Sequence, residues 1–159
     1  MDTLVNLATQ LGQALQTRGD MLALAESCTG GMVSTAVTDI AGSSAWFDRG
    51  FITYSNAAKQ EMLGVSAKIL AQHGAVSEET ALAMALGALK NSQAHITASI
   101  TGIAGPTGGS TDKPVGTVCF AWVNKEGLSI TATEHYVGNR EAVRLQAAIQ
   151  SISGLLGHL

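Results

Sequence analysis

The chain has 159 residues, of which 46% are apolar and only 13% are charged, with a net charge of −3. This length and apolar content predict a single domain over residues 1–159, and the small negative charge argues against nucleic acid as a partner. No apolar run reaches the roughly 18 residues of a membrane span and no basic leader precedes one, so we expect a soluble, cytoplasmic protein with no membrane partner.

The first part of the chain alternates helix-like and strand-like segments. Leu4, Leu7 and Leu11 recur at three- and four-residue steps, which is typical of an amphipathic helix. Asn56 precedes a second periodic segment and is the predicted N-cap of its helix. In chain order the predicted elements are a helix over 3–18, a strand over 21–25, a helix reaching about residue 40, a strand over 51–54 and a helix over 56–63.

The second part continues the alternation and ends in a hairpin. Ser66, Ser77 and Asn139 are predicted N-caps, and residues 124–127 form the predicted hairpin turn. The predicted elements are helices over 67–73 and 78–91, a strand over 96–101, a glycine-rich loop over 102–109, strands over 115–123 and 128–137, and a helix over 139–156. Alternating strands and helices with one hairpin predict an α/β fold, a three-layer α/β/α sandwich around a mixed β-sheet.

Ser27 ends the first predicted strand and precedes Gly30 and Gly31 at the start of a helix. Its hydroxyl would lie close to unpaired backbone amides, which can stabilise an oxyanion. This arrangement favours Ser27 as a nucleophile. The alternative is that Ser27 or Thr29 only caps the helix.

Lys59 lies in the first turn of its predicted helix, where the helix dipole disfavours a cation. Burial together with the positive helix end would lower the pKa of this lysine and let the neutral amine act as a base. Tyr54, at the end of the preceding strand, could bring its hydroxyl to the same space. The alternatives are an exposed lysine and a tyrosine at the sheet edge.

Cys28 is a rival nucleophile, but no histidine or other base adjoins it in sequence, and we rank it below Ser27. Cys28 and Cys119 are far apart and neither has a histidine at ligand spacing, so we predict no disulfide and no metal site. The four histidines are scattered along the chain, and we interpret them as structural or exposed: His73, His95, His135 and His158.

The glycine-rich loop over 102–109 could hold a phosphate through its backbone amides. It matches neither the dinucleotide-binding pattern nor the P-loop, so we do not expect a Rossmann or NTPase domain. Arg140 and Arg144 share a face at the start of the last helix and suit a carboxylate or phosphate ligand. They could equally be surface cations.

Several ordered motifs together resemble the CinA C-terminal domain family. The motifs span almost the whole chain and are residues 25–31 (AESCTGG), 54–56 (YSN) with Lys59, 74–77 (GAVS), 101–106 (TGIAGP) and 113–117 (KPVGT). The resemblance implies hydrolysis of nicotinamide mononucleotide to nicotinate mononucleotide and ammonia, a step of pyridine nucleotide recycling. It also implies a small-molecule nucleotide substrate and a homo-oligomer, most simply a dimer.

The resemblance assigns roles to particular residues. It makes Ser27 the nucleophile, Lys59 its base and Tyr54 an assisting hydroxyl. It assigns substrate binding to Arg140. We expect further substrate contacts from other residues of these motifs: Thr29, Gly30, Gly31, Asn56, Thr101, Gly102 and Gly105. In the expected mechanism, amides near Thr29, Gly30 and Gly31 stabilise the oxyanion, and no metal or organic cofactor takes part.

Two other functions stay open on the sequence. The chain could be a nucleotide-binding regulatory domain without catalysis, because a phosphate-holding loop alone would permit that function. It could also be an amidase for another small amide.

Overall fold

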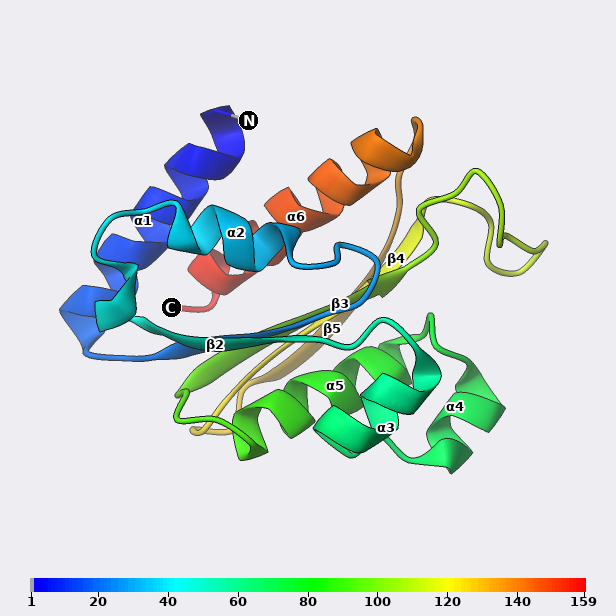
Figure 1. Cartoon of the computed structure of the whole chain (residues 1–159), viewed down its shortest axis with the longest axis horizontal. Helices are drawn as coiled ribbons and strands as arrows, with labels where there is room; N and C mark the ends of the chain where they lie inside the picture. The colour runs from blue at the N-terminus through cyan, green and yellow to red at the C-terminus, as the bar shows by residue number, and fades with distance from the viewer. Residues whose placement is uncertain (1) are drawn as a thin grey trace.

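The computed structural model describes residues 2–159 and contains a five-stranded sheet between two layers of helices (Figure 1). The strands are β1 (Leu22–Glu26), β2 (Phe47–Ile52), β3 (Ile96–Gly102), β4 (Thr117–Asn124) and β5 (Ser129–His135). The helices are α1 (Asp2–Arg18), α2 (Met32–Thr38), the short 3₁₀ helix η1 (Ser43–Ala45), α3 (Asn56–Leu63), α4 (Ala67–His73), α5 (Glu78–Lys90) and α6 (Arg140–Gly157).

The sheet is mixed, with the strand order β2-β1-β3-β4-β5. Strand β1 pairs in parallel with β2 and β3, whereas β3, β4 and β5 pair antiparallel. Helices α1, α2 and α6 cover one face of the sheet, and α3, α4 and α5 cover the other (Figure 1). The predicted three-layer α/β/α sandwich in a single domain is therefore confirmed.

The parallel centre of the sheet is buried on both faces because its strands have no solvent side. In β1, Leu22 and Leu24 pack into the main core beneath α1 and α6, while Ala25 faces the core beside α5. Two-residue alternation puts Glu26 on the same face as Leu22 and Leu24, and this carboxylate has no exposed surface. A fully buried acid at a strand end requires hydrogen-bond donors nearby.

Strand β3 bonds to the α5 side through hydroxyl groups. Thr97 Oγ1 donates to the Ala85 carbonyl, Ser99 Oγ to the Ala81 carbonyl and Thr101 Oγ1 to the Ala75 carbonyl. Small residues on α5 allow this close approach between helix and sheet. The contacts fix the end of β3, where the glycine-rich loop begins.

Most predicted elements are confirmed within two residues, and three are corrected. The strand predicted over 51–54 occupies Phe47–Ile52, because an edge strand tolerates the polar residues that hid its start. The helix after Ser27 is shorter than predicted, Met32–Thr38, and its N-cap is Gly31 without a side-chain cap bond. Ser55, rather than Asn56, caps α3, because its extended backbone lets Oγ accept from the Ala58 amide.

Candidate active site

The candidate site lies at the carboxyl ends of the parallel strands β1, β2 and β3. Figure 1 shows the turn after β1, the loop after β3 and the first residues of α3 and α6 gathering at this end of the sheet. Ligands of open α/β sheets commonly bind at such an edge, because the loops there converge. Ser27 comes from the turn after β1, Tyr54 from the link between β2 and α3, and Lys59 from the start of α3.

Glu26 fixes the turn that carries Ser27. Its carboxylate accepts five hydrogen bonds, from the Thr29 hydroxyl, the amides of Gly31 and Val33, and both the amide and the hydroxyl of Ser34. The acid thus occupies the N-terminus of α2 and satisfies amides that would otherwise be unpaired and buried. Neither Ser27 nor Thr29 caps the helix, so that alternative is wrong.

Ser27 and Lys59 are in direct contact. Lys59 Nζ lies 3.1 Å from Ser27 Oγ, although 32 residues of chain separate them. The Ser27 amide donates to the Ile100 carbonyl, which anchors the serine beside β3. Lys59 is only 1% exposed and Ser27 only 7% exposed, so the pair is shielded from bulk water.

The amine of Lys59 is held by two backbone carbonyls besides the serine. Its Nζ lies 3.1 Å from both the Thr53 and the Tyr54 carbonyl oxygens. Burial lowers the pKa of Lys59 below its ordinary value of 10.5, because the charged form loses hydration. No carboxylate forms an ion pair with this lysine among residues 2–159, so no strong opposing charge keeps it protonated.

The neighbouring thiol is poorly suited to compete with Ser27. Cys28 is buried, and burial raises the pKa of its thiol to about 12. The thiolate, which is the reactive form, is therefore scarce at neutral pH. This electrostatic difference supports the ranking of Ser27 above Cys28.

Tyr54 contributes its backbone to the lysine and its side chain to a different partner. The Tyr54 hydroxyl accepts from Arg140 Nη2 at 3.1 Å, and Arg140 Nη1 also donates to the Gly105 carbonyl at 2.8 Å. Tyr54 is 60% exposed. The structure therefore connects the tyrosine hydroxyl to Arg140 and the glycine-rich loop rather than to the Ser27–Lys59 pair.

The backbone amides of the turn differ in whether they are free. In the expected mechanism the Gly30 and Gly31 amides face an oxyanion, but in the structure both already donate hydrogen bonds within the fold. The Gly30 amide donates to the Ser27 carbonyl and the Gly31 amide to the Glu26 carboxylate. Thr29 is completely buried. Neither the Cys28 amide nor the Thr29 amide donates to an acceptor in residues 2–159, and of these two the Cys28 amide directly follows Ser27.

The other predicted substrate-binding residues surround this pair less closely. Asn56 is exposed on the first turn of α3. Thr101 is buried and its hydroxyl is committed to the Ala75 carbonyl, while Gly102 ends β3. A cavity of about 500 Å³ opens beside Arg140 and is lined by Ala104, Pro106, Val115, Gly138, Asn139, Arg140 and Glu141.

Sequence reasoning missed two residues that shape the site. Glu26 stands in the motif over residues 25–31 but was given no role, and the signal was a charged residue at the end of an otherwise apolar strand. Arg144 was interpreted as a ligand-binding or surface cation. In the structure it donates to the carbonyls of Cys28 and Thr29, the two residues that follow the serine.

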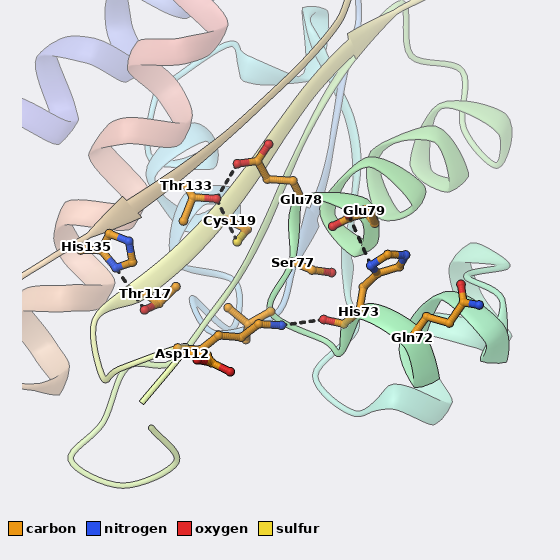
Figure 2. A pocket seen from close by; sticks show the side chains of 12 residues that line it. Gln72, His73, Ser77, Glu78, Glu79, Asp112, Thr117, Cys119, Thr133 and His135 are labelled. Atoms are coloured by element: carbon orange, nitrogen blue, oxygen red, sulfur yellow. Dashed lines mark hydrogen bonds and ion pairs between the residues drawn. The ribbon is translucent and has the colours of Figure 1, made fainter. Parts of the chain in front are cut away.

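A second cavity, of about 510 Å³, lies on the α5 side of the sheet (Figure 2), and neither Ser27 nor Lys59 lines it. Several of its polar side chains already have partners within the fold. Glu78 accepts from Thr133, Glu79 lies beside His73, and His135 contacts Thr117. We assign it no part in the chemistry.

Two further properties bear on the class of the protein. Within residues 2–159, no set of three or more His, Cys, Asp or Glu side chains is arranged to hold a metal ion. In the same part of the chain, no helix combines the length and apolar character needed to cross a membrane.

The fold and site define an α/β protein with a buried serine–lysine pair at the carboxyl edge of a mixed sheet. The family profile described as the CinA C-terminal domain matches residues 4–159, and the chain belongs to this family. The resemblance inferred from the motifs is thereby confirmed.

Named relatives cover nearly the whole chain. A protein of Enterobacter agglomerans named nicotinamide-nucleotide amidohydrolase PncC is 56% identical over 150 residues, which are 94% of this chain and 92% of the relative. A Pseudomonas putida protein of the same name is 46% identical and covers 98% of this chain and 97% of its own length. Among solved structures, the competence/damage inducible protein CihA of Agrobacterium tumefaciens has a TM-score of 0.96 at 44% identity, covering 98% of this chain and 94% of that one.

Proposed function

We propose that this protein hydrolyses the carboxamide of nicotinamide mononucleotide, giving nicotinate mononucleotide and ammonia. The observation that carries the proposal is the buried contact of 3.1 Å between Lys59 Nζ and Ser27 Oγ. Relatives named nicotinamide-nucleotide amidohydrolase, at up to 56% identity, support the choice of substrate.

The first half of the reaction forms an ester. Neutral Lys59 takes the Ser27 proton as Oγ attacks the carboxamide carbon, and the Cys28 amide donates to the developing oxyanion. An amide of the residue after the nucleophile is a common oxyanion donor in serine hydrolases. Collapse of the tetrahedral intermediate breaks the C–N bond, and Lys59 returns its proton to the departing nitrogen, which leaves as ammonia.

The second half consumes water. Lys59 takes a proton from a water molecule that attacks the ester carbon, and the C–O bond to Ser27 breaks as that proton returns to Oγ. The products are the carboxylic acid and the free enzyme, and the chain's own residues supply every proton transfer.

Substrate binding is assigned to the cavity beside Arg140. Its volume of about 500 Å³ suits a mononucleotide. The guanidinium has donors left after bonding Tyr54 and Gly105, so it can hold the phosphate while the glycine-rich loop contacts the ribose. Binding energy from this remote group would align the amide with Ser27.

Ammonia release from the nucleotide tests the proposal. Ser27→Ala should abolish turnover, and Lys59→Ala should lower kcat by about 10²- to 10⁴-fold, the usual contribution of a general base. Ser129→Ala and Lys68→Ala, which change exposed residues of the same types, are the matched controls. Wild-type turnover in either site variant would overturn the mechanism.

The same assay separates the other functions. A binding module would gain thermal stability from the nucleotide and release no ammonia. An amidase for another substrate would turn over free nicotinamide or an unrelated amide faster than the nucleotide.

The proposal includes the cytoplasmic location predicted from the sequence and assembly as a homodimer, which the family resemblance implies. Light scattering coupled to size exclusion tests the assembly, and a mass equal to one chain would exclude the dimer. Localisation of the tagged protein in fractionated cells tests the location.

A further inference from the structure

Arg144 reaches the turn that carries Ser27 from a distant helix. It lies on α6, one turn after Arg140, and donates through Nε to the Cys28 carbonyl at 3.1 Å and through Nη2 to the Thr29 carbonyl at 3.0 Å. The two carbonyls belong to consecutive residues, so Nε and Nη2 of one planar guanidinium bind the same short segment. A fork of this kind fixes direction as well as distance.

The segment that Arg144 binds is conformationally free without side-chain hydrogen bonds. It continues into Gly30 and Gly31, whose φ values of 57° and 103° lie in the left-handed region. Glycines give the turn its shape but leave it conformationally free. Glu26 holds the turn through the Thr29 hydroxyl and the Gly31 amide, and Arg144 holds it through the carbonyls of Cys28 and Thr29.

A displaced turn would move both reacting groups together. Ser27 Oγ must stay close to Lys59 Nζ, and the Cys28 amide must stay directed at the oxyanion. The Cys28 carbonyl lies in one planar peptide with the Thr29 amide, and the Cα of Cys28 joins that peptide to the one that carries the Cys28 amide, so a shift of the held carbonyls displaces the neighbouring peptide as well. Misplacing a reacting atom by about 1 Å can cost about 10²-fold in rate.

We propose that Arg144 is a positioning residue that holds the Ser27–Thr29 turn in its reactive geometry, an inference that rests on the proposed amide hydrolysis. Arg144 acts through the backbone and does not touch the substrate. This separates it from Arg140, which lines the cavity. It also differs from the shared phosphate site that the helical spacing of the two arginines had suggested.

Steady-state kinetics of Arg144→Ala and Arg144→Lys test the proposal. We expect kcat to fall about 10- to 100-fold in Arg144→Ala while KM changes less than about threefold, because only alignment is lost. Lysine cannot reproduce the fork, so Arg144→Lys should recover only part of the loss. Guanidinium ion at sub-denaturing concentration should restore kcat in Arg144→Ala. Arg18→Ala, which removes an exposed arginine at the end of α1, should match the wild type with and without guanidinium.

Labelling of Ser27 by a small fluorophosphonate, followed by intact mass, reports on the nucleophile without the nucleotide. Labelling should slow about tenfold in Arg144→Ala and be absent in Ser27→Ala. A raised KM with unchanged kcat would make Arg144 a substrate ligand and overturn the proposal. So would labelling and turnover equal to the wild type. A different outcome would refute only the proposed substrate. In that outcome Ser27 is labelled in the wild-type protein and more slowly in Arg144→Ala, but the wild-type protein releases no ammonia from the nucleotide.

Discussion

The pH dependence of turnover follows from the environment of Lys59. A lysine at its ordinary pKa of 10.5 is neutral in only about one molecule in 3,000 at pH 7. Deprotonating it at that pH costs about 4.8 kcal/mol of free energy. Burial lowers the pKa of Lys59, and each unit of lowering makes the neutral base about tenfold more abundant. We therefore expect log kcat to rise with a slope of one and to level off at an inflection below pH 10.5.

Ammonia release measured from pH 6 to pH 10.5 gives the profile. Lys59→Met should lose the rising limb together with most of the rate. Cys28→Ala should keep the limb, because burial raises the pKa of that thiol to about 12. A flat profile in the wild-type protein, or an unchanged inflection in Lys59→Met, would refute the reasoning.

The same titration affects stability. Between the lowered pKa of Lys59 and 10.5, the unfolded chain binds more protons than the folded protein, so the free energy of unfolding rises with pH across that interval. Below the lowered pKa, Lys59 is protonated in both states, so its contribution to the free energy of unfolding no longer changes with pH. Urea denaturation at several pH values should show the rise in the wild-type protein and a smaller one in Lys59→Met.

Three further substitutions have defined outcomes. Gly87→Ala would drive its Cβ into the Leu63 carbonyl oxygen, so we expect about 3 kcal/mol of destabilisation in thermal unfolding. Gly157→Ala, whose Cβ meets nothing within 4 Å, is the control. Glu26→Gln would turn an amide NH₂ toward the donors of α2 and should cost about 3 kcal/mol in urea denaturation; a loss below about 1 kcal/mol would contradict the capping role. Arg140→Gln should raise KM for the nucleotide about tenfold with little change in kcat, and a fall in kcat alone would remove it from substrate binding.

Much of the architecture was predictable because it depends on local patterns. Leucine spacing and serine or asparagine caps identified most helices, and the alternation of strands with helices indicated the mixed sheet. The exceptions have local causes. Strand β2 lies at an edge where polar residues break the apolar run, and Ser55 competes with Asn56 for the cap of α3.

The sequence by itself determined the class of fold, the family and the nucleophile candidate, because these depend on residue types at short spacing. Only the tertiary structure decided that Lys59 reaches Ser27 and that Arg140 and Arg144 face different partners. It also decided that Glu26 occupies the helix end where free amides were expected. Such contacts join segments that are distant along the chain, and they depend on how the strands order within the sheet, which local periodicity does not encode.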